Sequence, residues 1–281
     1  MVVENKAIIT YIQIQKEDLG VFRFIPKEGG EVPQYKAGQF LTLGAPVPAE
    51  GNKIVRRAYS IASNPENRKY IELYIRWVRK PLPGRLTTIL FSAKEGDEII
   101  WLKPTGPFHI EEKKHDGTPD NRRIVCLGGG TGLAPFVSYA KHLHATGSKR
   151  EVVVFHGASY VDELGYREEL TRLEEESLDR GKDKWNFRYR ATISRPDEWF
   201  NRTWNGNKGR VESFLQSKDG EMSPLEKLVG EKITKDNTVF FICGWQGTID
   251  GCMDVLTPKG FVTERNKRAD KSFEIKYESY G

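Results

Sequence analysis

A cation, an aromatic ring and a hydroxyl follow one another in Arg57-Ala58-Tyr59-Ser60. If this segment is a β-strand, alternation puts Arg57 and Tyr59 on one face and Ala58 and Ser60 on the other. A guanidinium and a ring that point the same way suit an anionic or aromatic ligand. The alternative is a surface cation–π pair on the wall of a barrel.

A second candidate is the turn that starts at Gly84 and continues through Arg85, Leu86, Thr87 and Thr88. It precedes a predicted short helix, whose first backbone amides lack intrahelical partners and suit a phosphate. The alternative is a helix that is simply capped by threonine.

A third candidate is the glycine-rich stretch from Gly128 to Pro135, between the apolar run 124–127 and helically spaced apolar residues at 133–143. Strand, glycine turn and helix in this order suit a phosphate or pyrophosphate at the helix start. No Gly-Lys-Ser/Thr closes the turn, so it is not a P-loop, and Leu133 replaces the third glycine of the dinucleotide fingerprint. A plain structural turn remains the alternative.

The elements that carry these segments change character along the chain. Residues 6–104 contain six β-branched or aromatic runs with one short helix near 85–91, which favours an antiparallel β-barrel. Residues 111–121 are polar and turn-rich, as in a linker. From residue 122 strands alternate with helices, which predicts an α/β domain with a parallel sheet. We expect domains at 1–117 and 118–281. The expected strands are 7–14, 21–25, 39–43, 57–61, 70–78, 98–102, 122–127, 151–156, 186–193, 238–243 and 272–277, and the later helices are 133–145, 162–177, 210–217, 224–230 and 246–256.

Composition and charge exclude several classes of function. The 281 residues carry 44 basic and 39 acidic side chains, a net charge of +5, which is not a nucleic-acid-binding composition. Three scattered cysteines, Cys126, Cys243 and Cys252, provide neither a metal site nor the ligands of an iron–sulfur cluster. No apolar run approaches the ~20 residues that span a bilayer, and Met1–Lys6 lacks a secretory signal, so we expect a cytoplasmic protein without membrane insertion.

Taken together, five motifs resemble the ferredoxin–NADP⁺ reductase family in order and spacing, over nearly the whole chain. They are Arg57-x-Tyr59-Ser60, Gly84-x-x-Thr87, Gly130-Thr-Gly-Leu-Ala-Pro135, Cys243-Gly244 and Glu278-Ser-Tyr280. The resemblance implies a FAD-binding antiparallel barrel followed by an NADP-binding α/β domain.

The same resemblance assigns roles at the flavin. Arg57 would contact the FAD pyrophosphate, Tyr59 would stack on the isoalloxazine, and Ser60 would lie near flavin N5. Tyr280 would cover the opposite face, with Tyr277 as the alternative because Gly281 follows Tyr280 here. The other residues expected at FAD are Ala58, Tyr74, Ile75, Arg76, Gly84, Arg85, Leu86 and Thr87.

Further roles are implied at the nicotinamide coenzyme. Cys243 would lie beside the position of hydride transfer, as a packing residue rather than a nucleophile, with Glu278 as a further catalytic residue. Arg195 and Arg210 would bind the 2′-phosphate of NADPH, although Ser159 stands where some bacterial members have another arginine. The other residues expected at NADP(H) are Thr131, Gly132, Pro135, Ser194, Gly244 and Gln246.

The implied activity is hydride transfer from NADPH to FAD, followed by single-electron transfer to ferredoxin or flavodoxin, in either physiological direction. One alternative is the NAD(P)H-dependent flavin reductase component of an oxygenase system. Another is a nonenzymatic NADP-binding regulatory protein. The net positive charge, with Arg56, Arg57, Arg76, Arg79, Lys80 and Arg85 near the expected flavin edge, favours an acidic protein partner. The sequence does not indicate the oligomeric state.

Overall fold

A computed structural model describes residues 5–181, 183–218 and 220–280. Met1–Glu4, whose lack of a secretory signal was noted above, and Gly281, which follows Tyr280, lie outside the described residues. Contacts divide the chain into two compact units. The first is Met1–His109 with Val137–His142, and the second is Ile110–Phe136 with Leu143–Gly281.

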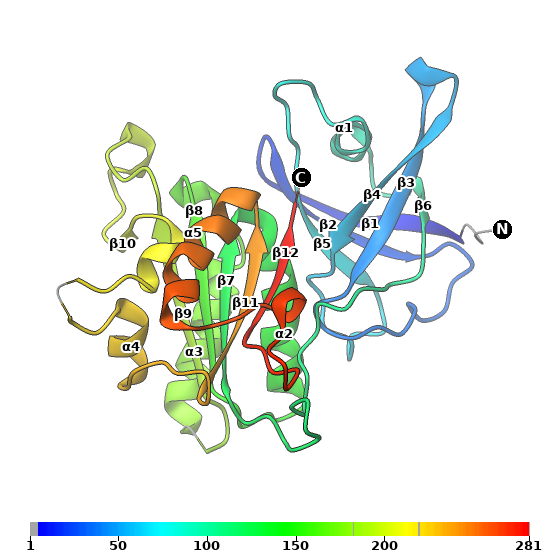
Figure 1. Ribbon diagram of the computed structural model, residues 1–281. Helices are drawn as coiled ribbons and strands as arrows, with labels where there is room; N and C mark the ends of the chain where they lie inside the picture. The colour runs from blue at the N-terminus through cyan, green and yellow to red at the C-terminus, as the bar shows by residue number, and fades with distance from the viewer. Residues whose placement is uncertain (1–4, 182, 219, 281) are drawn as a thin grey trace. The chain divides into compact units, whose positions relative to one another are not determined.

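The first unit is the predicted antiparallel barrel. Its six strands are adjacent in the order β4-β3-β6-β1-β2-β5 (Figure 1). A bridge between Ile61, just after β4, and Leu73 in β5 joins the two ends of the sheet. Phe22 and Phe24 are fully buried in the barrel core. The strands are β1 (Asn5–Lys16), β2 (Leu19–Pro26), β3 (Phe40–Val47), β4 (Lys53–Ser60), β5 (Ile71–Arg76) and β6 (Glu98–Trp101).

One short helix, α1 (Arg85–Ser92), covers part of the barrel. Leu86 and Leu90, four residues apart, bury their side chains in the barrel core. Helix α1 contacts β3 and also β4, the strand that carries Arg57 and Tyr59.

The second unit is the predicted parallel sheet with helices. Its strands are adjacent in the order β10-β9-β8-β7-β11-β12, and every neighbouring pair is parallel (Figure 1). The strands are β7 (Arg123–Gly129), β8 (Val152–Ala158), β9 (Phe187–Ile193), β10 (Asn207–Lys208), β11 (Thr238–Gly244) and β12 (Ile275–Ser279). Its helices are α3 (Arg167–Arg180), α4 (Pro224–Val229) and α5 (Gln246–Leu256), together with the two ends of α2 (Ala134–Ala145), whose middle part belongs to the first unit. Its short 3₁₀ helices are η2 (Gly130–Leu133), η3 (Val161–Glu163), η4 (Trp199–Asn201), η5 (Val211–Phe214), η6 (Thr257–Lys259) and η7 (Glu264–Asn266), while η1 (Pro48–Glu50) lies in the first unit.

The predicted helix at 210–217 is wrong. The segment forms only η5, with hydrogen bonds that span three residues, such as Ser213 N–H to the carbonyl of Arg210. Close packing explains the difference, because a β-carbon at Gly157 in β8 would lie 2.9 Å from Cβ of Val211. The buried Val211 therefore fixes this segment against the sheet as a single tight turn.

The helix expected at 162–177 begins later, at Arg167. Before it, Val161 N–H donates to the side chain of Asn201 (2.9 Å), which holds η3 as a separate turn. Tyr166 then takes a left-handed conformation (φ 59°), which an α-helix cannot include.

The segment expected to be a plain linker has structure of its own. Lys113 and Pro119 form an antiparallel bridge, and Asp120 is buried. Among the described residues, no helix combines the length and the apolar composition that crossing a bilayer requires.

Candidate cofactor and active site

Strand β4 presents an exposed cation next to a half-buried ring. Arg57 is exposed and donates through Nη1 to the carbonyl oxygen of Arg56 (2.7 Å). Tyr59 packs against the barrel core, and burial raises the pKa of its hydroxyl. That hydroxyl is buried and has no hydrogen-bond partner within the described part of the chain. An unpaired buried hydroxyl is costly, so this position is suited to a ligand that supplies a partner.

The start of α1 provides a set of backbone donors in the same unit. The first intrahelical hydrogen bond is from Thr88 N–H to the carbonyl of Gly84 (2.8 Å), so the amides before Thr88 precede the helical ladder. The hydroxyls of Thr87 and Thr88 also donate to the Gly84 carbonyl, at 3.0 and 2.9 Å. These threonines stabilise the turn, so the groups at this turn that remain suited to a phosphate are its backbone amides.

Two of the arginines expected at the flavin are held by carboxylates. Arg85 Nη1 donates to both carboxylate oxygens of Glu50, at 2.8 and 2.7 Å. Arg76 Nη1 pairs with Asp18 at 3.0 Å. Arg57 is the more available cation for an incoming phosphate.

The remaining residues expected at FAD divide by burial. Ile75 and Leu86 place their side chains in the barrel core, so only their backbones are available to a ligand. Tyr74 and Ser60 are buried, whereas Ala58 is exposed.

These residues fit FAD. The molecule needs a cation and backbone donors for its pyrophosphate, and an aromatic surface for its ring system. Arg57, the first turn of α1 and Tyr59 provide these groups, and the buried hydroxyl of Tyr59 can form a hydrogen bond with a polar ligand atom. Bound there, FAD would supply hydride acceptance and single-electron release.

In the second unit the glycine turn after β7 is shaped by packing. A β-carbon at Gly132 would lie 2.1 Å from the carbonyl oxygen of Cys243, and one at Gly129 would lie 2.6 Å from Oγ1 of Thr248. Gly130 has φ 56° and open space around it. Two of the glycines thus let the turn approach the end of β11 and the start of α5, while Gly130 leaves room on its outer side for a ligand.

Thr131, Gly132 and Pro135 follow that turn into α2. Thr131 is half-buried, and Pro135 is buried in the first turn of the helix, where its missing N–H costs no hydrogen bond. Gly244 closes the end of β11 with φ 156°, and the side chain of Gln246, the first residue of α5, donates to Asp250 (2.7 Å).

Strand β12 brings the end of the chain beside Cys243. In the parallel register Cys243 lies opposite Glu278, and Tyr280 N–H donates to the carbonyl of Gly244 (2.9 Å). The Cys243 thiol donates to the hydroxyl of Tyr280 (3.1 Å). Burial, followed by the charge of Glu278, raises the pKa of this thiol, so it stays protonated and is not a nucleophile.

Tyr277, the alternative ring, is already engaged. It packs against the core of the second unit, and the guanidinium of Arg265 lies 4.7 Å from its ring centroid. Tyr280 is therefore the better candidate for covering a flavin.

The expected 2′-phosphate residues come from the carboxyl ends of adjacent strands. Ser194 and Arg195 follow β9, and Arg210 follows β10, which pairs with β9. Arg210 is exposed, and its Nη1 would lie 3.7 Å from a β-carbon at Gly247, in the first turn of α5. The structure thus brings Arg210 to a helix N-terminus, where anions are favoured.

Two family models match the chain in sequence order. An oxidoreductase FAD-binding domain covers residues 6–110, and an oxidoreductase NAD-binding domain covers residues 126–253. The chain therefore belongs to the oxidoreductases that join a FAD-binding domain to an NAD-binding domain, as its resemblance to the ferredoxin–NADP⁺ reductase family implied. It is therefore a flavin-dependent oxidoreductase with FAD and a nicotinamide dinucleotide as cofactors, as predicted.

Similar proteins differ in their electron acceptors. The chain is 28% identical over 200 residues to a component of the Na⁺-translocating NADH-quinone reductase of Marinomonas sp. (strain MWYL1), covering 69% of this chain and 43% of that protein. It is 26% identical over 247 residues to the reductase component of propane 2-monooxygenase of Mycolicibacterium goodii, covering 87% and 61%. The chain thus spans about half the length of these curated relatives.

A solved structure of similar size confirms the fold. The ferredoxin NADP⁺ reductase from Neisseria gonorrhoeae, crystallised with FAD and NADP, superposes with a TM-score of 0.76 at 22% identity, over 99% of each chain. Both predicted architectures, the antiparallel barrel and the parallel sheet, are confirmed within this family.

The sequence did not predict the partners of Arg195. Arg195 Nη1 donates to the hydroxyl of Tyr160 (2.9 Å) and pairs with Glu198 (3.2 Å). The Tyr160 hydroxyl also donates to Glu198 (2.8 Å). The spacing Arg195-x-x-Glu198 is a local signal for such an ion pair, but Tyr160 lies in a different loop.

Proposed function

We propose that this protein oxidises NADPH and passes the electrons one at a time to ferredoxin or flavodoxin. In balance, NADPH loses a hydride, two acceptor molecules each gain one electron, and one proton is released. The observation that carries the proposal is the hydrogen bond between the Cys243 thiol and the Tyr280 hydroxyl at the carboxyl end of β11. It would hold an aromatic ring beside the proposed nicotinamide position, at the carboxyl ends of the strands, where parallel sheets bind ligands.

The protein's own residues bind and orient. Arg57 and the first turn of α1 would hold the FAD pyrophosphate, and Tyr59 would contact the ring system. The turn after β7 and Gly244 would hold the dinucleotide close to Cys243, whose neutral thiol tolerates a neighbouring nicotinamide ring. Glu278 lies opposite Cys243 in the neighbouring strand, and we propose that its carboxylate binds the carboxamide of that ring.

For the coenzyme we propose NADPH over NADH, because Arg195 and Arg210 together suit a phosphate dianion. Glu198 opposes this preference, since it already pairs with Arg195. The 2′-phosphate must therefore compete with a carboxylate for this guanidinium, which would make the preference smaller than two free arginines would give.

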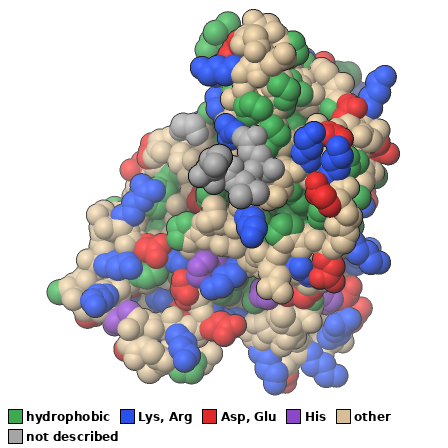
Figure 2. Space-filling view, turned by 90° about the vertical axis from the view of Figure 1, so that its right-hand side faces the viewer, with side chains coloured by type: hydrophobic (Ala, Val, Ile, Leu, Met, Phe, Trp, Pro, Cys, Tyr) green, Lys and Arg blue, Asp and Glu red, His purple; other side chains and the backbone are tan. Residues whose placement is uncertain are grey.

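The proposed acceptor is an acidic protein, but the basic surface is weaker than composition suggests. Arg76, Arg79 and Arg85 form ion pairs with Asp18, Glu17 and Glu50. On the face drawn in Figure 2, Lys and Arg side chains are interspersed with Asp and Glu. Among the arginines expected at the flavin edge, the exposed Arg57 is the one proposed to keep its charge for steering.

A second candidate is the reductase component of an oxygenase system, which the similarity to the propane 2-monooxygenase reductase favours. Both candidates predict a yellow protein, and a colourless preparation that FAD cannot reconstitute would contradict both.

One titration separates the two. NADPH oxidation is followed while ferredoxins, flavodoxins and oxygenase components are added in turn, at low and at physiological salt. We expect saturable stimulation by ferredoxin or flavodoxin that weakens as salt screens the charges. Stimulation by an oxygenase component alone would replace the first proposal with the second.

A further inference from the structure

The second unit contains a cavity of about 340 Å³ at the amino ends of its parallel strands. The glycine turn lies at the other end of the sheet, after β7. Arg122 precedes β7, Val239 lies near the start of β11, and Lys276 is the second residue of β12. A seven-residue strand such as β7 is roughly 20 Å long, so this cavity is separate from the coenzyme site. Its volume is within the range of small-molecule sites.

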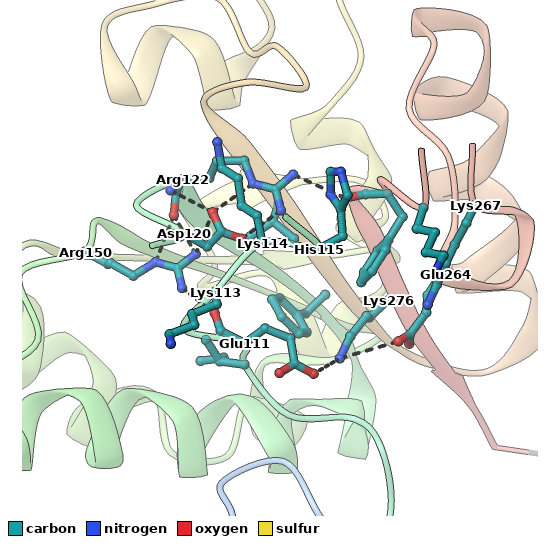
Figure 3. A pocket seen from close by; sticks show the side chains of 15 residues that line it. Glu111, Lys113, Lys114, His115, Asp120, Arg122, Arg150, Glu264, Lys267 and Lys276 are labelled. Atoms are coloured by element: carbon teal, nitrogen blue, oxygen red, sulfur yellow. Dashed lines mark hydrogen bonds and ion pairs between the residues drawn. The ribbon is translucent and has the colours of Figure 1, made fainter. Parts of the chain in front are cut away.

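Inside the cavity, every lining carboxylate is paired with a lining cation. Asp120 pairs with Arg122 at 2.7 Å and lies 3.8 Å from Arg150. Glu111 and Glu264 both approach the buried ammonium of Lys276, at 3.0 and 3.8 Å (Figure 3). These three carboxylates therefore have little negative charge to offer the remaining cations.

Four further lysines line the same cavity: Lys113, Lys114, Lys267 and Lys271. Lys267 lies 5.1 Å from the ring centroid of Phe273, and none of the four is in an ion pair with a carboxylate in the described part of the chain. His115 also lines the cavity, and the carboxylates of Asp116 and Asp270 lie near it. Those two carboxylates accept hydrogen bonds from Thr118 and from Ser272. The lining keeps an excess of positive charge.

Part of the cavity lining is apolar. It consists of Ile110, Val239, Phe241 and Phe273. A cavity with an apolar part and several cations suits an organic group that carries a multiply charged anion. A bare inorganic anion would leave the apolar side chains without a contact.

We propose that this cavity is a second ligand site, which binds a small organic phosphate. The phosphate contacts lysines of the lining, and the organic group lies against its apolar side chains. The site is independent of the proposed coenzyme site and of the flavin chemistry.

The test uses 1-naphthyl phosphate, a fluorescent ring with a phosphate dianion, and the FAD-loaded full chain. Fluorescence anisotropy is followed as protein is added, with and without saturating NADP⁺. We expect saturable binding that persists with NADP⁺. The variant Lys114→Met/Lys267→Met should weaken it at least about tenfold, because it removes two charge-assisted contacts.

The matched control is Lys218→Met/Lys232→Met, which removes the same charge from exposed positions of the same unit that do not line the cavity. Its affinity for 1-naphthyl phosphate should equal that of the unmodified protein. Equal weakening in both variants would show nonspecific charge attraction and overturn the proposal. So would complete displacement by NADP⁺, equally tight binding of 1-naphthol, or the absence of binding at about 1 mM.

Discussion

A β-carbon placed on Gly132 would lie 2.1 Å from the carbonyl oxygen of Cys243. Its next neighbours would be the carbonyl carbon of Cys243 and the amide nitrogen of Gly244, at 2.5 and 2.8 Å. All three atoms are backbone at the end of a central strand, so none can move as a side chain could. The glycine turn and β11 can reach this separation only without a side chain between them.

Gly132→Ala should therefore destabilise the protein by about 1–3 kcal/mol, the usual cost of overpacking, and weaken NADP⁺ binding. Urea unfolding and NADP⁺ titration measure the two effects. Gly247→Ala is the control, since its nearest neighbour would be Nη1 of Arg210 at 3.7 Å. A Gly132→Ala protein with unchanged stability would show that this contact is not as tight as the structure has it.

Arg57→Ala should lower flavin retention roughly tenfold to a hundredfold, because a charge-assisted hydrogen bond to the pyrophosphate is worth about 1.5–3 kcal/mol. Flavin release is measured by the recovery of free FAD fluorescence. Arg85→Ala serves as the comparison, since Glu50 already binds this guanidinium. If Arg85→Ala loses more flavin than Arg57→Ala, the assignment of Arg57 to the pyrophosphate is wrong.

Coenzyme preference tests the arginine cluster after β9. Arg195→Ala and Arg210→Ala should each reduce kcat/KM for NADPH and leave that for NADH nearly unchanged. Glu198→Gln should do the reverse, raising kcat/KM for NADPH severalfold because Arg195 is released from its carboxylate partner. Steady-state kinetics with both coenzymes decide this, and equal use of NADH and NADPH by the unmodified protein would refute both arginine roles.

Truncation after Ser279 should tighten nicotinamide binding and relax the preference against NADH, because it removes the ring that the coenzyme must displace. An aromatic stack is worth about 0.5–1.5 kcal/mol beyond its buried area. Tyr280→Phe keeps the ring but removes the hydroxyl that accepts from the Cys243 thiol, so its effect should have the same direction and be smaller than that of the truncation. If truncation leaves nicotinamide affinity, coenzyme preference and the flavin spectrum unchanged, Tyr280 does not lie on the flavin.

Stability should fall in mild acid because of His156. Burial lowers the pKa of this fully buried imidazole from 6.5 to about 4. Between these values the unfolded chain binds a proton that the folded chain does not, so stability is complete above pH 6.5 and declines toward pH 4. The loss amounts to about 3 kcal/mol by pH 4, of which about 2 kcal/mol falls between pH 7 and pH 5. Urea unfolding at pH 7 and pH 5 measures it, and His156→Gln should have a flatter profile; an equally steep one would assign the loss to other groups.

The sequence was informative where local pattern decides structure. The β-branched and aromatic runs located the barrel strands, and the short apolar runs before glycines located β7 and β11. The sequence could not reveal that Arg85 donates hydrogen bonds to Glu50, because the two residues are 35 positions apart. Nor could it show that Val211 meets Gly157, which replaces an expected helix by a tight turn. The glycines after β7 suggested that a ligand comes close to the backbone there. Gly129 and Gly132 are instead required because other parts of the protein pack closely against them.

Strand β12 lies at the edge of its sheet and pairs only with β11 among the described strands. Lys276, near its start, is fixed in the lysine-lined cavity, and Tyr280, just after its end, meets Cys243. The number of residues between Lys276 and Tyr280 therefore has to stay the same if both contacts are to be kept. Inserting or deleting one residue there would turn every following side chain to the opposite face. A change of one codon in the length of β12 would therefore separate Tyr280 from Cys243.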